Sequence, residues 1–139
     1  MDKLASDQRG ALMRKVRHKD TKGELAVRSL IHRLGYRFRL HRSDLPGKPD
    51  LVFPSRKKVI FVHGCFWHGH DCRAGRNRPA TNTPYWDKKL RRNVGRDKSN
   101  LALLCDRGWS AMVVWECELK RIDELARRMV EFLGSRSLK

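Results

Sequence analysis

The sequence predicts an α/β fold in which helices pack on a mixed central sheet. Three observations support this fold class: a length of 139 residues, short apolar runs typical of buried strands, and longer stretches with apolar residues at helical spacing. The expected order is α-β-β-β-α-β-α, with residues 21–139 as a single domain and residues 1–20 as a basic arm or helix ahead of it. A helix between the last two strands favours a right-handed crossover in the sheet.

The first half of the chain is predicted to form one helix and a group of strands. Residues 21–24, Thr-Lys-Gly-Glu, have the spacing of a capping box, and an amphipathic helix follows until Gly35. A loop over 54–57 separates two strands of a hairpin. The strands are expected at residues 36–40, 50–53 and 58–63.

The second half is predicted to contain a loop, a long helix, a strand and a closing helix. Residues 73–82 are rich in Gly, Pro and Asn, which indicates a loop. Thr83-Pro84 reads as an N-cap with proline at the first helical position, and the helix continues through Leu104. The apolar run within 109–116 predicts a buried strand, and a final helix runs from Ile122 to Leu133.

The charge of the chain indicates a polyanionic partner. The chain has 32 Lys and Arg residues against 15 Asp and Glu, which gives a formal charge of +17 and a pI of about 10.6. Nucleic acid is the first candidate, and no apolar run approaches the roughly 20 residues of a membrane-spanning helix. Without a signal-peptide pattern, we expect an intracellular, cytoplasmic protein whose four cysteines are thiols or metal ligands.

The stretch KVIFVHGCFWHGHDC, residues 58–72, combines a buried strand with residues that bind soft metals. Three of its residues, together with one cysteine after the last strand, are predicted to bind a structural zinc: Cys65, His70, Cys72 and Cys117. Cys105 is excluded because it is expected on the apolar face of the long helix, where a thiol behaves as a small hydrophobe. The alternative is four unlinked thiols and a surface histidine.

Several acidic and histidine side chains are candidates for hydrolytic chemistry. Asp50 begins one strand of the predicted hairpin and His63 ends the other, so we expect them to face each other at one edge of the sheet. A carboxylate there could hold Mg²⁺, and a nearby imidazole, His63 or His68, could take a proton from water. The alternative for Asp50 is a turn cap, and the alternative for His63 and His68 is a packed or surface histidine. Glu24 fits a capping box, and Asp97 fits surface ion pairs.

These segments together resemble the very-short-patch repair (Vsr) DNA mismatch endonucleases. The resemblance extends from about Met13 to Cys117, and its residues are LPGKPD at 45–50, HGCFWH at 63–68, PAT at 79–81, Trp86, Asn93, Arg96-Asp97 and VWEC at 114–117. It implies the restriction-endonuclease-like α/β fold. It also implies an enzyme that nicks one strand of double-stranded DNA beside a T·G mismatch, which arises when 5-methylcytosine deaminates.

The resemblance also implies roles for individual residues. Asp50 and the backbone carbonyl of Val62 would bind the catalytic Mg²⁺, and His68, oriented by Asp97, would be the base that activates water. Waters on the magnesium would be held by His63 and Glu24. Cys65, His70, Cys72 and Cys117 would bind the structural zinc.

The resemblance further implies how the mismatch is reached. Phe66, Trp67 and Trp86 would form a wedge that enters the base stack from the major groove, while the segment around Met13 would contact the minor groove. The alternative for the aromatics is core packing, which fits Trp86 best because it shares helical spacing with Leu90 and Val94.

A different class of function is also compatible with the charge, the zinc ligands and the aromatics, namely a non-catalytic zinc-containing DNA-binding module. Asp50, His63 and His68 at adjoining strand ends favour the nuclease, since binding alone does not need them. A restriction nuclease is disfavoured because stacking aromatics suit a distorted site.

We expect a monomer associated with the nucleoid of a prokaryotic cell, and functional links to mismatch-repair proteins and a DNA cytosine methyltransferase.

Overall fold

The computed structural model describes residues 21–40, 42–76 and 83–134. The predicted N-terminal arm, with Met13, lies outside these residues. The helices are α2 (Lys22–Arg33), α3 (Arg73–Arg76), α4 (Thr83–Asp106) and α5 (Ile122–Leu133), with 3₁₀ turns η1 (Pro54–Arg56) and η2 (Glu116–Arg121). The strands are β1 (Arg39–Leu40), β2 (Leu51–Phe53), β3 (Lys58–His63) and β4 (Ser110–Trp115).

The four described strands form a mixed sheet in the order β1-β2-β3-β4. The β2–β3 hairpin is antiparallel, as predicted, with Leu51 paired to Ile60. Strands β3 and β4 are parallel, with His63 paired to Trp115, and α4 makes the crossover between them. The predicted mixed sheet is therefore confirmed.

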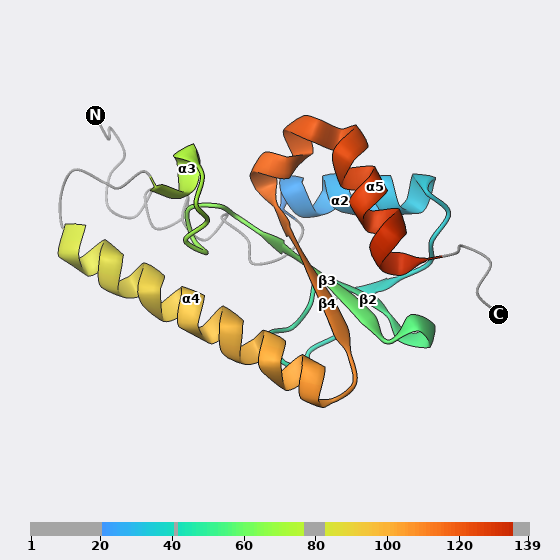
Figure 1. The fold of residues 1–139 in the computed structure, drawn as a ribbon, viewed down its shortest axis with the longest axis horizontal. Coiled ribbons are helices and arrows are strands. Elements are labelled where there is room, and N and C mark those ends of the chain that lie inside the picture. Colours follow the sequence, from blue (N-terminus) through green and yellow to red (C-terminus); the bar gives the residue numbers. More distant parts are fainter. Residues whose placement is uncertain (1–20, 41, 77–82, 135–139) are drawn as a thin grey trace, which may run out of the picture.

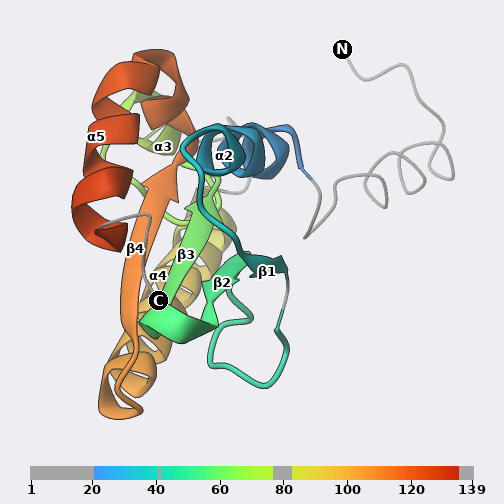
Figure 2. The ribbon, with the colours of Figure 1, turned by 90° about the vertical axis from the view of Figure 1, so that its right-hand side faces the viewer.

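Helices cover both faces of the sheet (Figures 1 and 2). Side chains alternate between the two faces along a strand, so Ile60 and Met112 point to one side and Val59 and Phe61 to the other. The first side packs against α2 and α5, and the second packs against the C-terminal half of α4 through Leu104. The sheet is thus buried between two hydrophobic clusters, which explains why β3 reads as a continuous apolar run.

The structure differs from the prediction in a few elements. Strand β1 covers only 39–40 rather than 36–40, because the buried Tyr36 turns into the core and its hydroxyl donates a hydrogen bond to the carbonyl of Gly134. A short helix, Arg73–Arg76, lies in the predicted loop. Cys105 is exposed, because it lies one residue beyond the buried Leu104 and hence about 100° around the helix. Its predicted apolar packing was wrong.

Candidate active site and metal centre

The candidate site lies where β3 and β4 end. Because these strands are parallel, the chain leaves both of them at the same edge of the sheet, after His63 and after Trp115. The polar residues that follow β3 therefore lie beside those that follow β4. The segment 64–72 also folds back on itself, since the backbone N–H of His70 donates to the carbonyl of Cys65 at 3.0 Å.

The four predicted zinc ligands come together at this edge. The ligand atoms of Cys65, His70, Cys72 and Cys117 all lie within 4.8 Å of one another, and Cys117 Sγ is 3.6 Å from His70 Nδ1. Bond lengths of about 2.3 Å to sulfur and 2.0 Å to nitrogen in a tetrahedral zinc site put neighbouring ligand atoms roughly 3.5–3.8 Å apart. The residues present therefore fit zinc.

The electrostatics of the thiols support the same interpretation. The pKa of the Cys65 thiol is raised to about 12, chiefly by burial and also by the neighbouring thiols of Cys117 and Cys72, against a backbone hydrogen bond at Cys117 that lowers it. A buried thiolate among other thiols is unstable unless a cation compensates its charge. The cluster thus has the chemistry of a soft-metal site.

A buried pair of carboxyl groups lies next to the strand ends. Asp50 Oδ2 accepts a hydrogen bond of 2.6 Å from the backbone N–H of Val62, so Asp50 contacts the strand one residue short of the predicted partner, His63. Glu24 is only 2% exposed, and Thr21 Oγ1 accepts the backbone N–H of Glu24 at 3.1 Å, which fixes this end of α2. The cap therefore leaves the Glu24 side chain to face inward, where it pairs with Arg28.

The pKa of Asp50 is raised to about 7, chiefly by burial and also by its hydrogen bond and repulsion with Glu24, while the hydrogen bond from Val62 and the charge of Arg28 oppose the shift. Arg28 balances the charge of one of these two buried carboxyl groups, and the second carboxylate would need a further cation to be stable in its ionised form. This donor set, made of hard oxygen ligands, fits a divalent ion such as Mg²⁺.

Two histidines and an aspartate form the third group. The rings of His63 and His68 stack with centroids 3.7 Å apart and planes 5° from parallel, and His68 Nδ1 lies 2.6 Å from Asp97 Oδ2. The ligand atoms of all three lie within 4.8 Å of one another. However, ring-nitrogen lone pairs lie in the ring planes, so one ion cannot lie in two parallel planes. The arrangement therefore suits proton transfer better than shared metal binding.

His63 is a neutral imidazole at neutral pH. Its pKa is lowered to about 4, chiefly by burial and also by the neighbouring His68, against the opposing effect of Asp97. Its Nδ1 atom is buried and has no hydrogen-bond partner in the part of the chain that the structure describes. A buried polar atom of this kind needs a hydrogen-bond partner beyond the described residues, such as water.

The three predicted wedge residues form one aromatic cluster beside these groups. The ring centroids of Phe66, Trp67 and Trp86 are 5.1–5.9 Å apart, and the planes meet edge to face. Each ring is only half-buried, so the cluster is not part of the core. The side-chain amide of Asn93 donates to the Trp67 carbonyl at 3.0 Å and ties the cluster to α4.

Comparison with known proteins identifies the family. The family model described as "DNA mismatch endonuclease Vsr" matches residues 1–74. The chain is 52% identical over 132 residues to "Type II nicking enzyme V.XorIIP" of Xanthomonas oryzae, covering 95% of this chain and 96% of the relative. The chain belongs to the Vsr family. It is also 41% identical to "DNA mismatch endonuclease Vsr" of Escherichia coli over 113 residues, covering 81% of this chain and 72% of the relative.

The Vsr resemblance is therefore confirmed at the level of the family. The model match ends at residue 74, so it includes the HGCFWH motif but stops before Asp97 and Cys117. The structure brings those two residues to the motif through α4 and β4, where they lie next to His68 and His70.

The candidate site contains residues that the sequence pattern did not indicate. Arg28 pairs with Glu24 from the next turn of α2, and the Lys89 ammonium lies 5.6–5.9 Å from the ring centroids of Trp67, Tyr85 and Trp86. The spacing of Lys89, three and four residues after two aromatics on a helix, is a signal that could have found it. Trp115 was named only as part of the VWEC motif.

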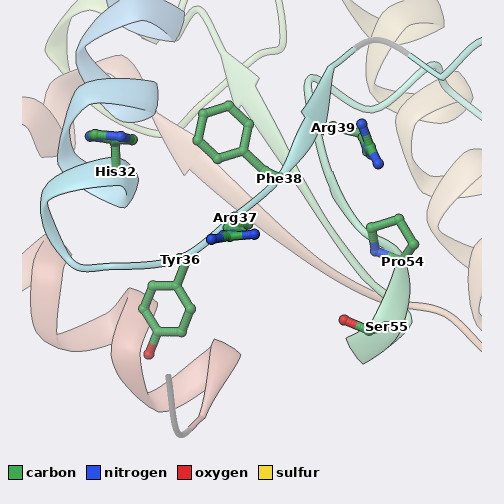
Figure 3. A pocket seen from close by; sticks show the side chains of 7 residues that line it. All are labelled: His32, Tyr36, Arg37, Phe38, Arg39, Pro54 and Ser55. Carbon is green, nitrogen blue, oxygen red and sulfur yellow. The ribbon is translucent and has the colours of Figure 1, made fainter. Parts of the chain in front are cut away.

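The structure also has a cavity of about 580 Å³ outside the candidate site, and Figure 3 shows the residues that line it. It is lined by residues of the α2 end, the 36–39 segment and η1, and η1 precedes β3 whereas the site follows it. Its lining has two arginines among seven residues, close to the chain-wide share of basic residues, so charge does not mark it as a binding site. The candidate site lies instead at the edge of the sheet where β3 and β4 end. None of the described helices is long and apolar enough to cross a membrane.

Proposed function

We propose that this Vsr-family chain nicks one strand of duplex DNA at a T·G mismatch by Mg²⁺-dependent hydrolysis of a phosphodiester. The observation that carries the proposal is the convergence of the His68–Asp97 pair, 2.6 Å apart, with the stacked His63 at the end of β3. A binding module has no need for this arrangement. The names of the relatives, a DNA mismatch endonuclease and nicking enzymes, support the same activity.

The carboxylate of Asp50 and the backbone carbonyl of Val62 are the groups that would hold Mg²⁺. When bound, the ion would neutralise negative charge on the phosphate as it develops in the transition state. The raised pKa of Asp50, about 7, supports this assignment, because a cation next to the buried carboxyl groups would remove the cause of the shift. The buried Nδ1 of His63 and the carboxylate of Glu24 would orient waters at the same place.

His68 is the proposed general base. Its Nδ1–H donates to Asp97, which leaves Nε2 to accept the proton from the attacking water. The water oxygen then bonds to phosphorus, and the bond to the bridging oxygen breaks; that oxygen keeps the bonding electron pair and takes up a proton from water, which leaves one strand nicked. Asp97 holds the imidazole in the correct tautomer and stabilises its protonated form, in the manner of a carboxylate that orients a histidine base.

The aromatic cluster is the proposed mismatch reader. A T·G wobble pair stacks less well than a Watson–Crick pair, so entering the stack there costs less of the few kcal/mol per step that intercalation demands. Each aromatic face returns roughly 1–3 kcal/mol by stacking on a base. The half-buried rings of Phe66, Trp67 and Trp86 support this proposal, and Lys89 adds a cation next to two of them.

Zinc is proposed as a structural ion on Cys65, His70, Cys72 and Cys117. Four protein ligands complete a tetrahedron and leave no position for water, which separates this site from the hydrolytic groups.

The test is a nicking assay on matched T·G and T·A duplexes, with and without added Mg²⁺. We expect nicks only in the T·G duplex with Mg²⁺, and Asp50→Ala should abolish nicking while mismatch binding survives. Asp44→Ala, which removes an exposed carboxylate from an Arg42 pair, is the matched control and should nick like the parent. A protein that binds the T·G duplex but never nicks it would instead be a DNA-binding module.

A further inference from the structure

We propose that Trp115 is a positioning residue that holds the catalytic histidines against the proposed zinc centre. This inference rests on the proposed function, because it assigns a role within the same site. It makes the zinc centre part of the catalytic geometry as well as of the fold.

The contacts of the Trp115 indole carry the proposal. One of its faces stacks on His70, with centroids 4.2 Å apart and planes 12° from parallel. The same ring meets His63 at 5.2 Å and 71°, and His68 at 6.4 Å and 66°, both edge to face. Of the aromatic contacts among the described residues, those of Trp115 are the ones that reach both a zinc-ligand candidate and the histidine stack.

The backbone fixes Trp115 from both sides. It ends β4 directly opposite His63 in the parallel ladder, so the two side chains leave the sheet on the same face. Its backbone N–H donates to Glu118 Oε1 at 3.0 Å, and Glu118 is paired with Arg128 on α5. Two residues later the chain reaches Cys117, another candidate ligand. The indole therefore lies between the histidine stack and the candidate zinc ligands. The sheet and η2 determine the positions of these two groups.

Core packing alone does not explain this residue. Trp115 is half-buried and belongs to neither hydrophobic cluster of the sheet, and its ring partners are three imidazoles. The plane of His70 is set by the direction of its ligating Nδ1 atom toward the thiols. The indole stacked on that plane then limits how far the His63–His68 stack can tilt. A base that loses such support is misplaced relative to the water it must activate.

The test compares Trp115→Leu, Trp115→Phe and the parent, each with its zinc bound. We expect Trp115→Leu to bind one zinc and to bind the T·G duplex within about threefold of the parent, while its single-turnover nicking rate falls about 10- to 100-fold. Trp115→Phe, which restores a flat ring, should recover most of the rate. Trp109→Leu is the control, since Trp109 lies before the start of β4, next to Arg42 and Lys57, and should keep the parental rate.

A second measurement does not depend on activity. Replacing zinc by cadmium, a larger thiolate-binding ion of the same charge, should shift the NMR signals of the His63 and His68 ring protons in the parent and not in Trp115→Leu. If the leucine variant does not fold, Trp115→Met repeats both measurements with a flexible side chain.

The proposal is overturned if Trp115→Leu nicks at the parental rate, if its loss of rate follows a loss of zinc, or if cadmium shifts the histidine signals equally with and without the indole. A parent protein that fails to nick the T·G duplex would refute the proposed function, and the cadmium comparison would still decide the role of Trp115.

Discussion

Replacing Asp50 by asparagine should stabilise the magnesium-free protein at pH 8 while abolishing nicking. Asp50 ionises at about 7 in the folded chain and near 3.8 when unfolded, so between these pH values the folded state binds more protons than the unfolded state. The contribution of Asp50 to stability therefore falls as the pH rises from about 4 to about 7, and it stays low above that range.

The difference of about 3 pH units corresponds to about 4 kcal/mol as an upper limit, and we expect a gain of roughly 1–3 kcal/mol because part of the shift is shared with Glu24. Asparagine can still accept the hydrogen bond from the Val62 N–H, and its amide can donate to Glu24. With roughly 3 °C per kcal/mol for a domain of this size, the Tm at pH 8 should rise by about 3–9 °C. At pH 4 the parent and the variant should unfold at nearly the same temperature.

The assay is thermal unfolding in magnesium-free buffer without chelator, since a chelator would also remove the zinc proposed for the thiol cluster. Asp44→Asn is the control, because the pKa of Asp44 lies below its ordinary value owing to hydrogen bonds from Arg42, and this variant should show no gain. Adding Mg²⁺ at pH 8 should stabilise the parent and leave Asp50→Asn unchanged. A variant no more stable than the parent at pH 8 would refute the reasoning that burial and Glu24 destabilise the ionised Asp50.

Three further outcomes are expected. Cys117→Ser should lower both the zinc content and the Tm, whereas Cys105→Ser should retain the metal, and equal zinc in the Cys117 variant and the parent would contradict the assigned ligands. His68→Ala should slow single-turnover nicking about 10²- to 10⁴-fold with little change in affinity for the mismatch, and Asp97→Asn should slow it by a smaller factor; parental rates would leave the base unidentified. Trp67→Ala should narrow the preference for T·G over T·A duplexes and keep the salt dependence of binding, because charge acts on both duplexes alike, and an equal loss of affinity for both would assign discrimination to base-edge contacts.

Elements with a strong local signal, such as a strand buried on both faces of the sheet or a helix start marked by proline, could be predicted well from the sequence. Strand β3 occupies residues 58–63 as expected, because its apolar run is buried on both sides. Helix α4 begins at Thr83, one residue before the predicted first helical position at Pro84, so the proline signal located the start of the helix to within one residue. By contrast η2, residues 116–121, is polar and lacks a period of either kind, so its sequence gave no signal.

The candidate site was predictable where its residues are close in the chain. The segment from His63 to Cys72 can be recognised as a candidate site from the sequence alone, because metal-ligand residues and aromatics are mixed there without a helical or strand period. The roles of Glu24 and Asp97 depend on contacts across the fold, with Asp97 29 residues from His68, and local spacing indicated only a cap and surface pairs. For both residues only the family resemblance suggested a catalytic partner.

The thiol cluster also has a consequence for the connectivity of the chain. A metal ion on Cys65 and Cys117 would close a covalent and coordinate ring that contains the aromatic cluster, the long helix α4 and strand β4. By analogy with a disulfide, closing a ring of about 50 residues removes roughly 4 kcal/mol of chain entropy from the unfolded state.

Three of the four candidate ligands lie within residues 65–72, whereas Cys117 reaches them where β4 pairs with β3, so Cys117 should join the metal late in folding, after these strands pair. A single proteolytic cut within the ring would then leave both fragments bound to one ion. The segments proposed to contact DNA would therefore remain attached to the rest of the protein even when the chain between them is broken.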